Sequence, residues 1–417
     1  MSFAPAELRT LPNGLRVVFV PCEAESVAVG IFVATGSRHE RPAEAGISHF
    51  IEHMLFKGTP TRRPVDITRA IEGRGGNFNA YTGEESTCYY AHLPSEYLGE
   101  AVDILSDMYL NATFPEDEFV REKAVVIEEI KMYADEPDSV AMENLQRGLF
   151  PSSPLGSPVA GSPASLGPLR PDDLRRYVDA HYRPDNTAVV VAGAFDPDRA
   201  EALLVKALGG FRRGKRPQSK RASAFGRPVR EVSVAKDVNQ VQLALGYRTF
   251  GIEDRRRYAA TVMDAVLGRG MSSRLFQAVR EKRGLCYDIS SRMQFFQDAG
   301  MFVVAAGTDS GRAAQTLATI DRELTRLVDR PVSAAELRRT LDFLVGNFRL
   351  AHEKVTSKMF FYGSTLLSFG RLISPAEQVQ ELRAVTPAEV QAAAKAVLSP
   401  SKRSVSWVVP RTAAAGD

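Results

Sequence analysis

Cysteines are few in this 417-residue chain, and no two of them have the spacing of a CxxC motif. The three, Cys22, Cys88 and Cys286, are odd in number and far apart, which argues against a disulfide framework and fits a reducing compartment. No apolar run approaches the ~18 residues that a membrane crossing needs. The first twenty residues lack the basic and apolar segments of a secretory signal and the features of a transit peptide. These absences predict a cytoplasmic protein with no membrane span.

An excess of charge of one sign is also missing. The 53 basic and 50 acidic residues leave a formal net charge of +3, so the composition gives no reason to expect nucleic-acid binding. Hydrophobic residues make up 44% and charged residues 25% of the chain, which is typical of a folded globular protein. Two or more packed domains are expected, because a single hydrophobic core rarely serves so long a chain.

The second half of the chain repeats the plan of the first at a spacing of roughly 215 residues. A helical stretch opened by proline, closed by a second proline, and followed by a β-rich run occurs at 171–191 and again at 387–408. Strand-like runs lead into a helical pattern at the start of each half, at 15–57 and 230–268. Each half is therefore predicted to be an α+β layer, in which helices cover an antiparallel-rich sheet.

The repeats predict two homologous domains, residues 1–210 and residues 229–417. Residues 211–228 between them are rich in Gly, Ser, Pro and basic side chains, which is typical of a linker. The basic run could instead be a nucleic-acid or targeting patch, although a solvated connector is the interpretation that its composition favours.

The most informative motif is His49-Phe50-Ile51-Glu52-His53, which lies in a stretch with helical apolar spacing. Residues four apart share one face of a helix, so His49 and His53 can bind one ion through their imidazoles. Glu52 lies beside them and can accept a proton from water, as a general base does. HxxEH is the motif of the inverzincin zinc enzymes. The alternative is a half-buried helix whose two histidines are satisfied by local hydrogen bonds.

A third ligand is expected on a second long helical pattern farther along the chain. Glu122, Val125, Val126 and Glu129 fall on one stripe of that helix. Two carboxylates on a valine-bearing face would be costly to bury without a partner, whereas a bound cation would compensate them. Glu129 is the predicted ligand and Glu122 the predicted supporting residue, while Glu128 is expected to face water. The alternative is an ordinary surface helix rich in glutamate.

With these residues in place, the sequence resembles the pitrilysin-type zinc metallopeptidases, especially the half-length branch of the mitochondrial processing peptidase. The resemblance covers nearly the whole chain. His49, Glu52 and His53 match the zinc helix of that family, and Glu122 and Glu129 match its two downstream glutamates. The resemblance implies one Zn²⁺ per chain, with Glu129 as the third ligand and Glu52 as the catalytic base.

The segment from Gly75 to Thr82 precedes a β-like run and suggests a turn into an edge strand. A peptide could add to such an edge through backbone hydrogen bonds. The segment could equally be a hairpin that only packs under the metal helix. It resembles the GGxxNAxT cleft segment of the family, which implies substrate contacts for Asn79, Ala80 and Thr82.

In the second half, Arg280 and Tyr287 lie seven residues apart, which alone indicates little more than a helix end followed by a strand. They resemble the Arg/Tyr pair of the family, which implies that they hold substrate and stabilise the developing oxyanion. The counterpart of the metal helix carries Thr261, Asp264 and Ala265 in place of the ligands and the base. The second half is therefore not expected to bind zinc.

The resemblance implies a zinc-dependent endopeptidase, similar to a processing peptidase, that cleaves short or unfolded polypeptides. In the family two such chains close as a clamshell, so both motifs in one chain favour a homodimer in which Arg280 and Tyr287 act at the zinc site of the other chain. Heterodimers also occur among relatives in the family and are the alternative. One alternative is a non-catalytic assembly subunit of the same fold, which would need none of the metal-binding residues. Another is a hydrolase of esters or phosphates, for which oxygen-rich ligands would be expected.

Overall fold

The computed structural model describes residues 5–212, 214 and 226–411. Of the predicted linker 211–228, residues 213 and 215–225 lie outside the described residues. The described residues form two compact units, and each unit combines segments from both halves of the chain. The first unit takes in the described residues of Met1–Ile130, Ser157–Lys220 and Arg349–Ala376, and the second those of Lys131–Gly156, Arg221–Phe348 and Glu377–Asp417.

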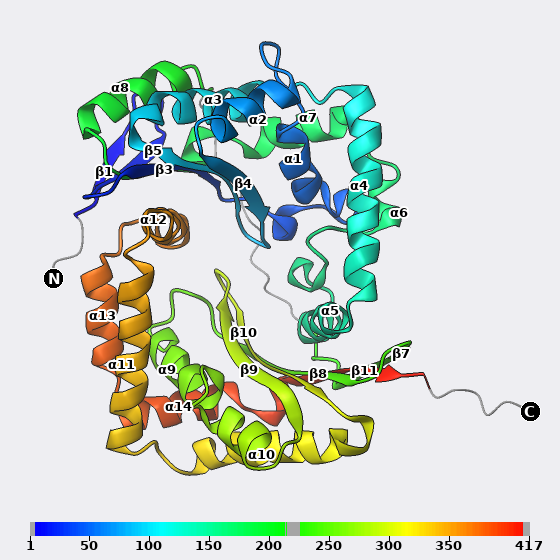
Figure 1. Cartoon of the computed structure of the whole chain (residues 1–417). Coiled ribbons are helices and arrows are strands. Elements are labelled where there is room, and N and C mark those ends of the chain that lie inside the picture. The colour runs from blue at the N-terminus through cyan, green and yellow to red at the C-terminus, as the bar shows by residue number, and fades with distance from the viewer. Residues whose placement is uncertain (1–4, 213, 215–225, 412–417) are drawn as a thin grey trace, which may run out of the picture. The chain divides into compact units, whose positions relative to one another are not determined.

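The first unit is built on a six-stranded sheet (Figure 1). Its strands lie in the order β1-β2-β6-β3-β5-β4, and all neighbours run antiparallel except β2 and β6, which are parallel. The late strand β6 is thus inserted in the middle of the sheet, and β4 is left at one edge. The strands are β1 (Glu7–Thr10), β2 (Arg16–Pro21), β3 (Ser26–Val33), β4 (Asn77–Thr82), β5 (Thr87–Pro94) and β6 (Thr187–Gly193).

Helices cover both faces of this sheet, and its central strands are correspondingly apolar. Every residue of the valine-rich strand β6 is buried, as expected for a strand that packs on both faces. One face packs against α1, α2, α3, α7 and α8, and the other against α12. The helices of this unit are α1 (Ile47–Leu55), α2 (Pro64–Glu72), α3 (Leu98–Asn111), α4 (Glu116–Asp135, which ends in the second unit), α6 (Pro163–Leu166), α7 (Pro171–His181), α8 (Pro197–Leu208) and α12 (Val355–Phe369).

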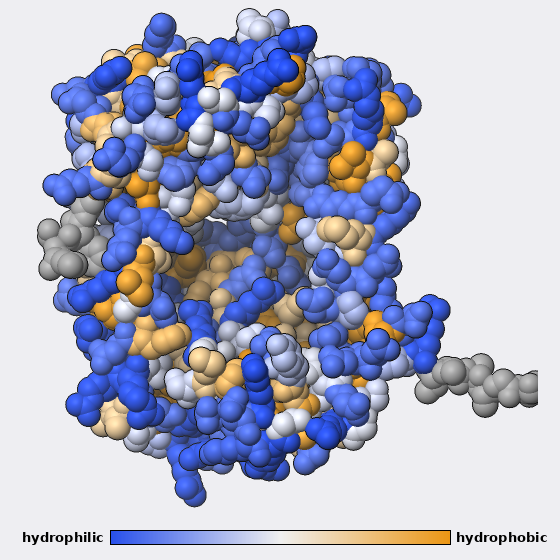
Figure 2. Space-filling view, viewed as in Figure 1, coloured by the Kyte–Doolittle hydropathy of each residue, from blue (hydrophilic) through white to orange (hydrophobic). Residues whose placement is uncertain are grey.

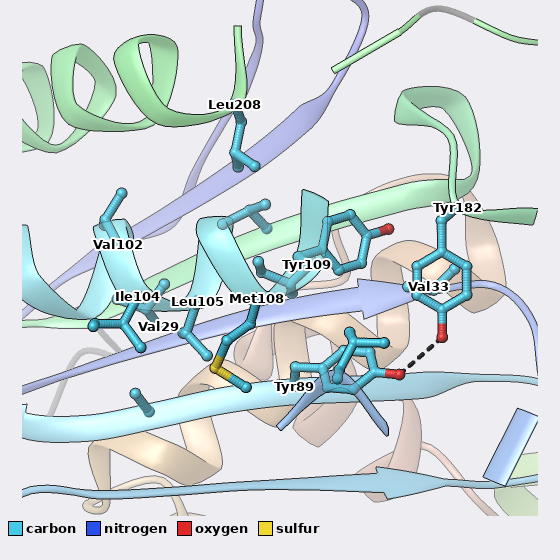
Figure 3. Packing of buried hydrophobic residues seen from close by; sticks show 14 of the residues in the cluster. Val29, Val33, Tyr89, Val102, Ile104, Leu105, Met108, Tyr109, Tyr182 and Leu208 are labelled. Atoms are coloured by element: carbon cyan, nitrogen blue, oxygen red, sulfur yellow. Dashed lines mark hydrogen bonds between the residues drawn. The ribbon is translucent and has the colours of Figure 1, made fainter. Parts of the chain in front are cut away.

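Figure 3 shows part of the core between α3 and the sheet. Leu105 and Met108 of α3 lie over Val29 of β3, and all three side chains are buried. The hydroxyls of Tyr89 and Tyr182 are 2.8 Å apart, so these two polar atoms are paired inside the apolar layer. Burial of large apolar side chains, with their few polar atoms satisfied, holds this side of the unit together.

The second unit repeats this architecture with a five-stranded sheet (Figure 1). Its order is β7-β11-β8-β10-β9, with β7 and β11 as the parallel pair. The strands are β7 (Glu231–Lys236), β8 (Val241–Thr249), β9 (Cys286–Phe295), β10 (Gly300–Thr308) and β11 (Arg403–Pro410). The helices are α5 (Pro137–Leu149), α9 (Arg257–Gly268), a π-helical turn (Phe276–Glu281), α10 (Ala313–Asp329), α11 (Ala334–Ala351), α13 (Pro375–Arg383) and α14 (Pro387–Val397).

The two sheets share one topology, apart from the extra strand β1. In each, a late strand pairs in parallel with an early one, and the edge strands β4 and β9 hold equivalent places. The predicted α+β fold with two repeated sheets is therefore confirmed. The compact units nevertheless differ from the contiguous stretches 1–210 and 229–417. Helix α12 packs on β2, β3 and β6 of the first unit, and α5 packs on β7, β8 and β11 of the second, so each half supplies a covering helix to the other unit.

The polarity of the surface and the length of the apolar helices can both be compared with what the composition predicts. The face shown in Figure 2 is mainly hydrophilic, with hydrophobic residues in small scattered groups. Within the described part of the chain, no helix combines the length and the apolar character that a membrane crossing requires.

Helix α12 packs closely on β3 because it has glycine at the contact. A Cβ atom placed on Gly363 would lie 2.4 Å from a ring carbon of Phe32, and protein interiors have little free volume to absorb such an overlap. Gly346, within α11, has no other atom within 4 Å of an added Cβ.

We expect Gly363→Ala to lower the free energy of unfolding by about 1–3 kcal/mol, because the added methyl group must displace Phe32. The matched variant Gly346→Ala should be neutral or up to ~1 kcal/mol more stable, since alanine is the better helix former. Urea unfolding followed by circular dichroism measures both. Equal stability of the two variants would show that the α12–β3 contact is looser than described.

Candidate metal centre

The HxxEH motif lies on α1, as its apolar spacing predicts. Phe50, Ile51 and Met54 are fully buried against the sheet, which leaves His49 and His53 together on another side of the helix. Their ring centroids are 4.7 Å apart. The local sequence thus determines both that this helix forms and that its two imidazoles are neighbours.

The N-terminus of α1 is held by Glu40, a residue that sequence analysis did not identify. One carboxylate oxygen accepts a hydrogen bond from the backbone N–H of Gly46 at 2.7 Å and the other from that of Ser48 at 2.8 Å. Gly46 has φ +93°, and a Cβ there would lie 2.6 Å from the carbonyl oxygen of Ala160, so glycine is required at this position. The contacts fix where the metal helix begins.

Helix α4 brings the two predicted glutamates to α1. The phenyl rings of Phe119 on α4 and Phe50 on α1 pack with centroids 4.9 Å apart, so an apolar contact sets the spacing of the two helices. Glu122 is only 8% exposed and Val126 is fully buried. Glu129 is half-buried.

The prediction that all four residues of the stripe lie on the inward face of α4 is wrong for one of them. Val125 is 50% exposed, because the buried face of α4 is narrower than the stripe and follows the i, i+4, i+7 positions Glu122, Val126 and Glu129. Glu128 is exposed, as expected. The inward side of this helix therefore carries one valine between two glutamates.

His49, His53 and Glu129 converge. The distance from Glu129 Oε2 to Nε2 of His49 is 3.8 Å and to Nε2 of His53 is 3.4 Å, and one donor atom from each residue lies within 4.8 Å of the others. Among the described residues this is the one such group of three His, Cys, Asp or Glu side chains. A tetrahedral zinc with bonds near 2.0–2.1 Å holds its N and O ligands about 3.3 Å apart, so this donor set fits zinc.

Burial favours the neutral form of the His49 imidazole and makes the Glu52 carboxylate more basic. Burial, together with the neighbouring His53, lowers the pKa of His49 to about 4, so its nitrogen lone pairs are available at neutral pH. Burial also raises the pKa of Glu52, although the hydroxyl of Thr82 and the nearby His53 partly offset this effect. Glu52 Oε2 and His49 Nδ1 are buried without a hydrogen-bond partner among the described residues. A carboxylate with a raised pKa is the better proton acceptor.

The second imidazole is hydrogen-bonded on its far side. His53 Nδ1 lies 2.9 Å from Glu122 Oε1, and Lys57 Nζ lies 2.5 Å from the other oxygen of that carboxylate. Burial opposes the charge of Glu122, but the hydrogen bonds from His53 and Lys57 outweigh it and lower its pKa. For His53, the Glu122 hydrogen bond and nearby carboxylates raise the pKa against the effect of burial. Glu122 therefore contacts His53 on one side and Lys57 on the other, and Lys57 is an additional residue that sequence analysis missed.

The predicted substrate segment forms the edge strand β4, which pairs with β5 on one side only. Phe78 packs against Phe56, with ring centroids 5.3 Å apart at the end of α1. The hairpin thus packs under the metal helix and also leaves one edge unpaired by any described strand. Along that edge, the Asn79 side-chain oxygen accepts a hydrogen bond from the N–H of Ala80 at 2.8 Å, and Thr82 lies near Glu52.

Arg280 and Tyr287 form a pair within the second unit. The Arg280 guanidinium lies 5.2 Å from the centroid of the Tyr287 ring and 4.7 Å from that of Phe276, a cation–π geometry. Tyr287, on the edge strand β9, is 80% exposed. It lines a cavity of about 380 Å³ in this unit, together with polar side chains that include Asp138, Gln240, Gln242, Asp288 and Arg292.

The counterpart of the metal helix, α9, carries no metal group. Asp264 is fully buried, and its carboxylate contacts Arg269 Nε at 2.5 Å and the Ser291 hydroxyl at 2.6 Å. The Thr261 hydroxyl donates to the backbone carbonyl of Arg257 in its own helix. The polar side chains of Asp264 and Thr261 thus have their partners within the second unit.

Comparison with known proteins identifies relatives over almost the whole chain. Residues 16–162 match the family model of insulinase (peptidase family M16), and residues 168–344 match that of the peptidase M16 inactive domain. The chain is 36% identical over 391 residues to YmxG of Bacillus subtilis, which is described as an uncharacterized zinc protease. The aligned residues cover 93% of this chain and 94% of YmxG. An uncharacterized zinc protease of Mycobacterium tuberculosis is 37% identical over 396 residues, 94% of this chain and 90% of that protein.

Solved structures share the fold. A protease from Helicobacter pylori superimposes with a TM-score of 0.92 at 22% identity, over 98% of this chain and 100% of the other. A structure from Pseudomonas fluorescens described as a peptidase M16 inactive domain gives a TM-score of 0.91 at 19% identity, over 98% of both chains.

Glu40 should make stability depend on pH. Burial raises its pKa to about 7, although the backbone N–H groups of Ser48 and Gly46 act in the opposite direction. Because the folded pKa lies above the ordinary value, the stabilising contribution is complete below about pH 4.5 and is lost as the pH rises through about 7. We expect the unfolding free energy to fall by about 2–3 kcal/mol between pH 5 and pH 8 from this group.

Glu40→Gln should remove that part of the pH dependence, whereas Glu72→Gln, at an exposed glutamate in α2, should retain it. Urea unfolding of the wild type and both variants between pH 5 and pH 8 measures the effect. A wild-type slope that Glu40→Gln leaves unchanged would assign the pH dependence to other groups.

Proposed function

The chain belongs to the M16 (insulinase) family of peptidases, and on that premise we propose that it is a zinc-dependent endopeptidase that cleaves short or unfolded polypeptides. The observation that carries the proposal is the convergence of two imidazoles and one carboxylate from helices α1 and α4. This donor set suits zinc better than magnesium, which prefers oxygen ligands in an octahedron. Peptide-bond hydrolysis is therefore favoured over Mg²⁺-type phosphoryl chemistry.

Nε2 of His49, Nε2 of His53 and the Glu129 carboxylate would hold the ion. When bound there, zinc supplies Lewis-acid polarisation of a peptide carbonyl and lowers the pKa of a water molecule. Glu52, next to His53 on the same helix, accepts the proton of the attacking water and passes it to the leaving amine. Its buried oxygen without a hydrogen-bond partner supports this role, because the oxygen is left available for a water molecule or a substrate.

Substrate binding is assigned to two edge strands. A peptide in extended conformation would pair with β4 along the edge formed by Asn79, Ala80 and Thr82. Arg280 and Tyr287 supply a cation and a phenol to the carbonyl oxygen that becomes negatively charged. The high exposure of Tyr287 supports a contact with another molecule, and the cavity beside it offers room for substrate side chains.

We further propose a homodimer, in which the Arg280–Tyr287 pair of one chain serves the zinc site of the other. The presence of both the metal motif and the Arg/Tyr pair in each chain supports this arrangement. A non-catalytic assembly subunit of the same fold is the alternative. The intact group of His49, His53 and Glu129 favours the enzyme, because a purely structural role gives no reason to retain it.

Removing the third ligand should remove the metal. We expect Glu129→Gln to reduce zinc from about one per chain to well below one, because a neutral amide is a much weaker ligand than a carboxylate. The exposed neighbour Glu128 serves as the matched control, and Glu128→Gln should retain full zinc. The zinc content of the purified proteins is measured after dialysis. Full zinc occupancy in Glu129→Gln would refute the assignment of Glu129 as a ligand.

Removing the base should separate binding from turnover. Glu52→Gln should bind zinc as the wild type does but lower kcat/KM on a quenched peptide library by ~10²–10⁴, the usual contribution of a general base. A chelator should abolish wild-type activity, and added zinc should restore it. Retained turnover in Glu52→Gln would refute the assignment of the base. A zinc-loaded wild type without peptidase activity would favour the assembly subunit.

A further inference from the structure

Lys57 continues the row of functional residues on the metal helix. It follows His53 by four positions, just as His53 follows His49. Although α1 ends at Leu55, the backbone N–H of Lys57 donates to the carbonyl of Met54 at 3.1 Å, so the chain makes one more turn in the same direction. The lysine side chain therefore projects on the side of α1 that carries the histidines.

Basic and acidic side chains alternate where α1 and α4 face each other. Glu129 lies between His49 and His53, at 3.8 and 3.4 Å from their Nε2 atoms. One step along, Glu122 lies between His53 Nδ1 at 2.9 Å and Lys57 Nζ at 2.5 Å. Each of these two carboxylates thus contacts two basic side chains. The basic residues are spaced four apart in the sequence, and the two carboxylates are seven apart on α4.

The Glu122 carboxylate needs both of its partners. Its side chain is only 10% exposed, and a buried carboxylate left with part of its hydrogen bonding unmet costs several kcal/mol. Lys57 is 24% exposed at its side chain, so its stem is packed while the ammonium reaches inward. Among the described residues, His53 and Lys57 are the two ion-pair partners of Glu122.

We propose that Lys57 is a positioning residue for the metal site and that it acts through Glu122. The ammonium holds one carboxylate oxygen, which aims the other at Nδ1 of His53 and keeps the hydrogen of that imidazole on Nδ1. The lone pair of Nε2 then points towards Glu129 and His49. Without the ammonium, the carboxylate would turn to water to regain a partner, and the ring of His53 would lose both its orientation and its preferred tautomer. The inference rests on the zinc site of the proposed function.

The affinity of the metal-free protein for Zn²⁺, measured against a chromophoric chelator, tests the inference. We expect Lys57→Met to bind zinc ~10–100-fold more weakly, the usual effect of losing an outer hydrogen-bond partner of a ligand. Lys57→Arg should restore most of the affinity, because it supplies a cation at the same place. Lys206→Met, at an exposed lysine of α8, removes one positive charge elsewhere and should bind as the wild type does. Circular dichroism shows whether each variant is folded.

A double-mutant cycle separates positioning from general stabilisation. If Lys57 acts through Glu122, Lys57→Met should add less than about twofold to the loss already caused by Glu122→Gln. Additive losses would overturn the proposal. Wild-type affinity in folded Lys57→Met would overturn it as well.

A second readout needs no metal. In metal-free protein labelled with ¹⁵N-histidine, and at a pH where His53 is neutral, we expect the wild type to carry the hydrogen on Nδ1. Lys57→Met should show a mixture of tautomers, and a His53→Asn variant assigns the signals. An unchanged tautomer in Lys57→Met would overturn the proposal. Absence of zinc binding in the wild type would refute the proposed function, whereas the tautomer would still decide the role of Lys57.

Discussion

The candidate site depends on the pairing of carboxylates from α4 with basic groups from α1. Charged groups at this depth are tolerated only when their partners are in place, so the position of the helices and the electrostatics of the site determine each other. The ring contact between Phe50 and Phe119 supplies the apolar part of the same interface. Hydrophobic packing thus sets the distance between the helices, and at that distance the charged side chains of α1 and α4 are in contact.

The rest of the first unit serves to keep α1 in place. The sheet lies under its apolar side, Glu40 binds the backbone at its N-terminus, and Lys57 binds Glu122 just past its C-terminus. A general base and metal ligands work only when they are held within fractions of an ångström. Fixing one short helix at both ends and along one side meets that requirement.

The second unit shows that the fold alone does not make a metal site. It has the same sheet order and an equivalent helix, α9, yet Asp264 there is paired with Arg269 and Ser291 inside the protein. The same position has become part of the core, while the edge strand β9 carries the exposed Tyr287. Two copies of one architecture thus hold different sets of polar residues, which is how one fold can support different roles.

Features that depend on neighbours along the chain can be predicted from the order of the amino acids. The repeat of two α+β layers, the helix that carries His49, Glu52 and His53, and the common face of Glu122 and Glu129 all follow from periodicity. The edge strand β4 could also be predicted, because the two glycines that precede it and its alternating residues are local signals.

The contacts between helices and strands, in contrast, depend on how the whole chain packs. Three features have no local signature: the exposure of Val125, the pairing of Lys57 with Glu122, and the packing of α5 and α12 in the unit built mainly from the other half of the chain. Each depends on residues far apart in sequence, such as His53 and Glu122, which are separated by 69 positions. Periodicity tells which face of a helix is apolar, whereas the partner of that face is set by how all the elements pack together.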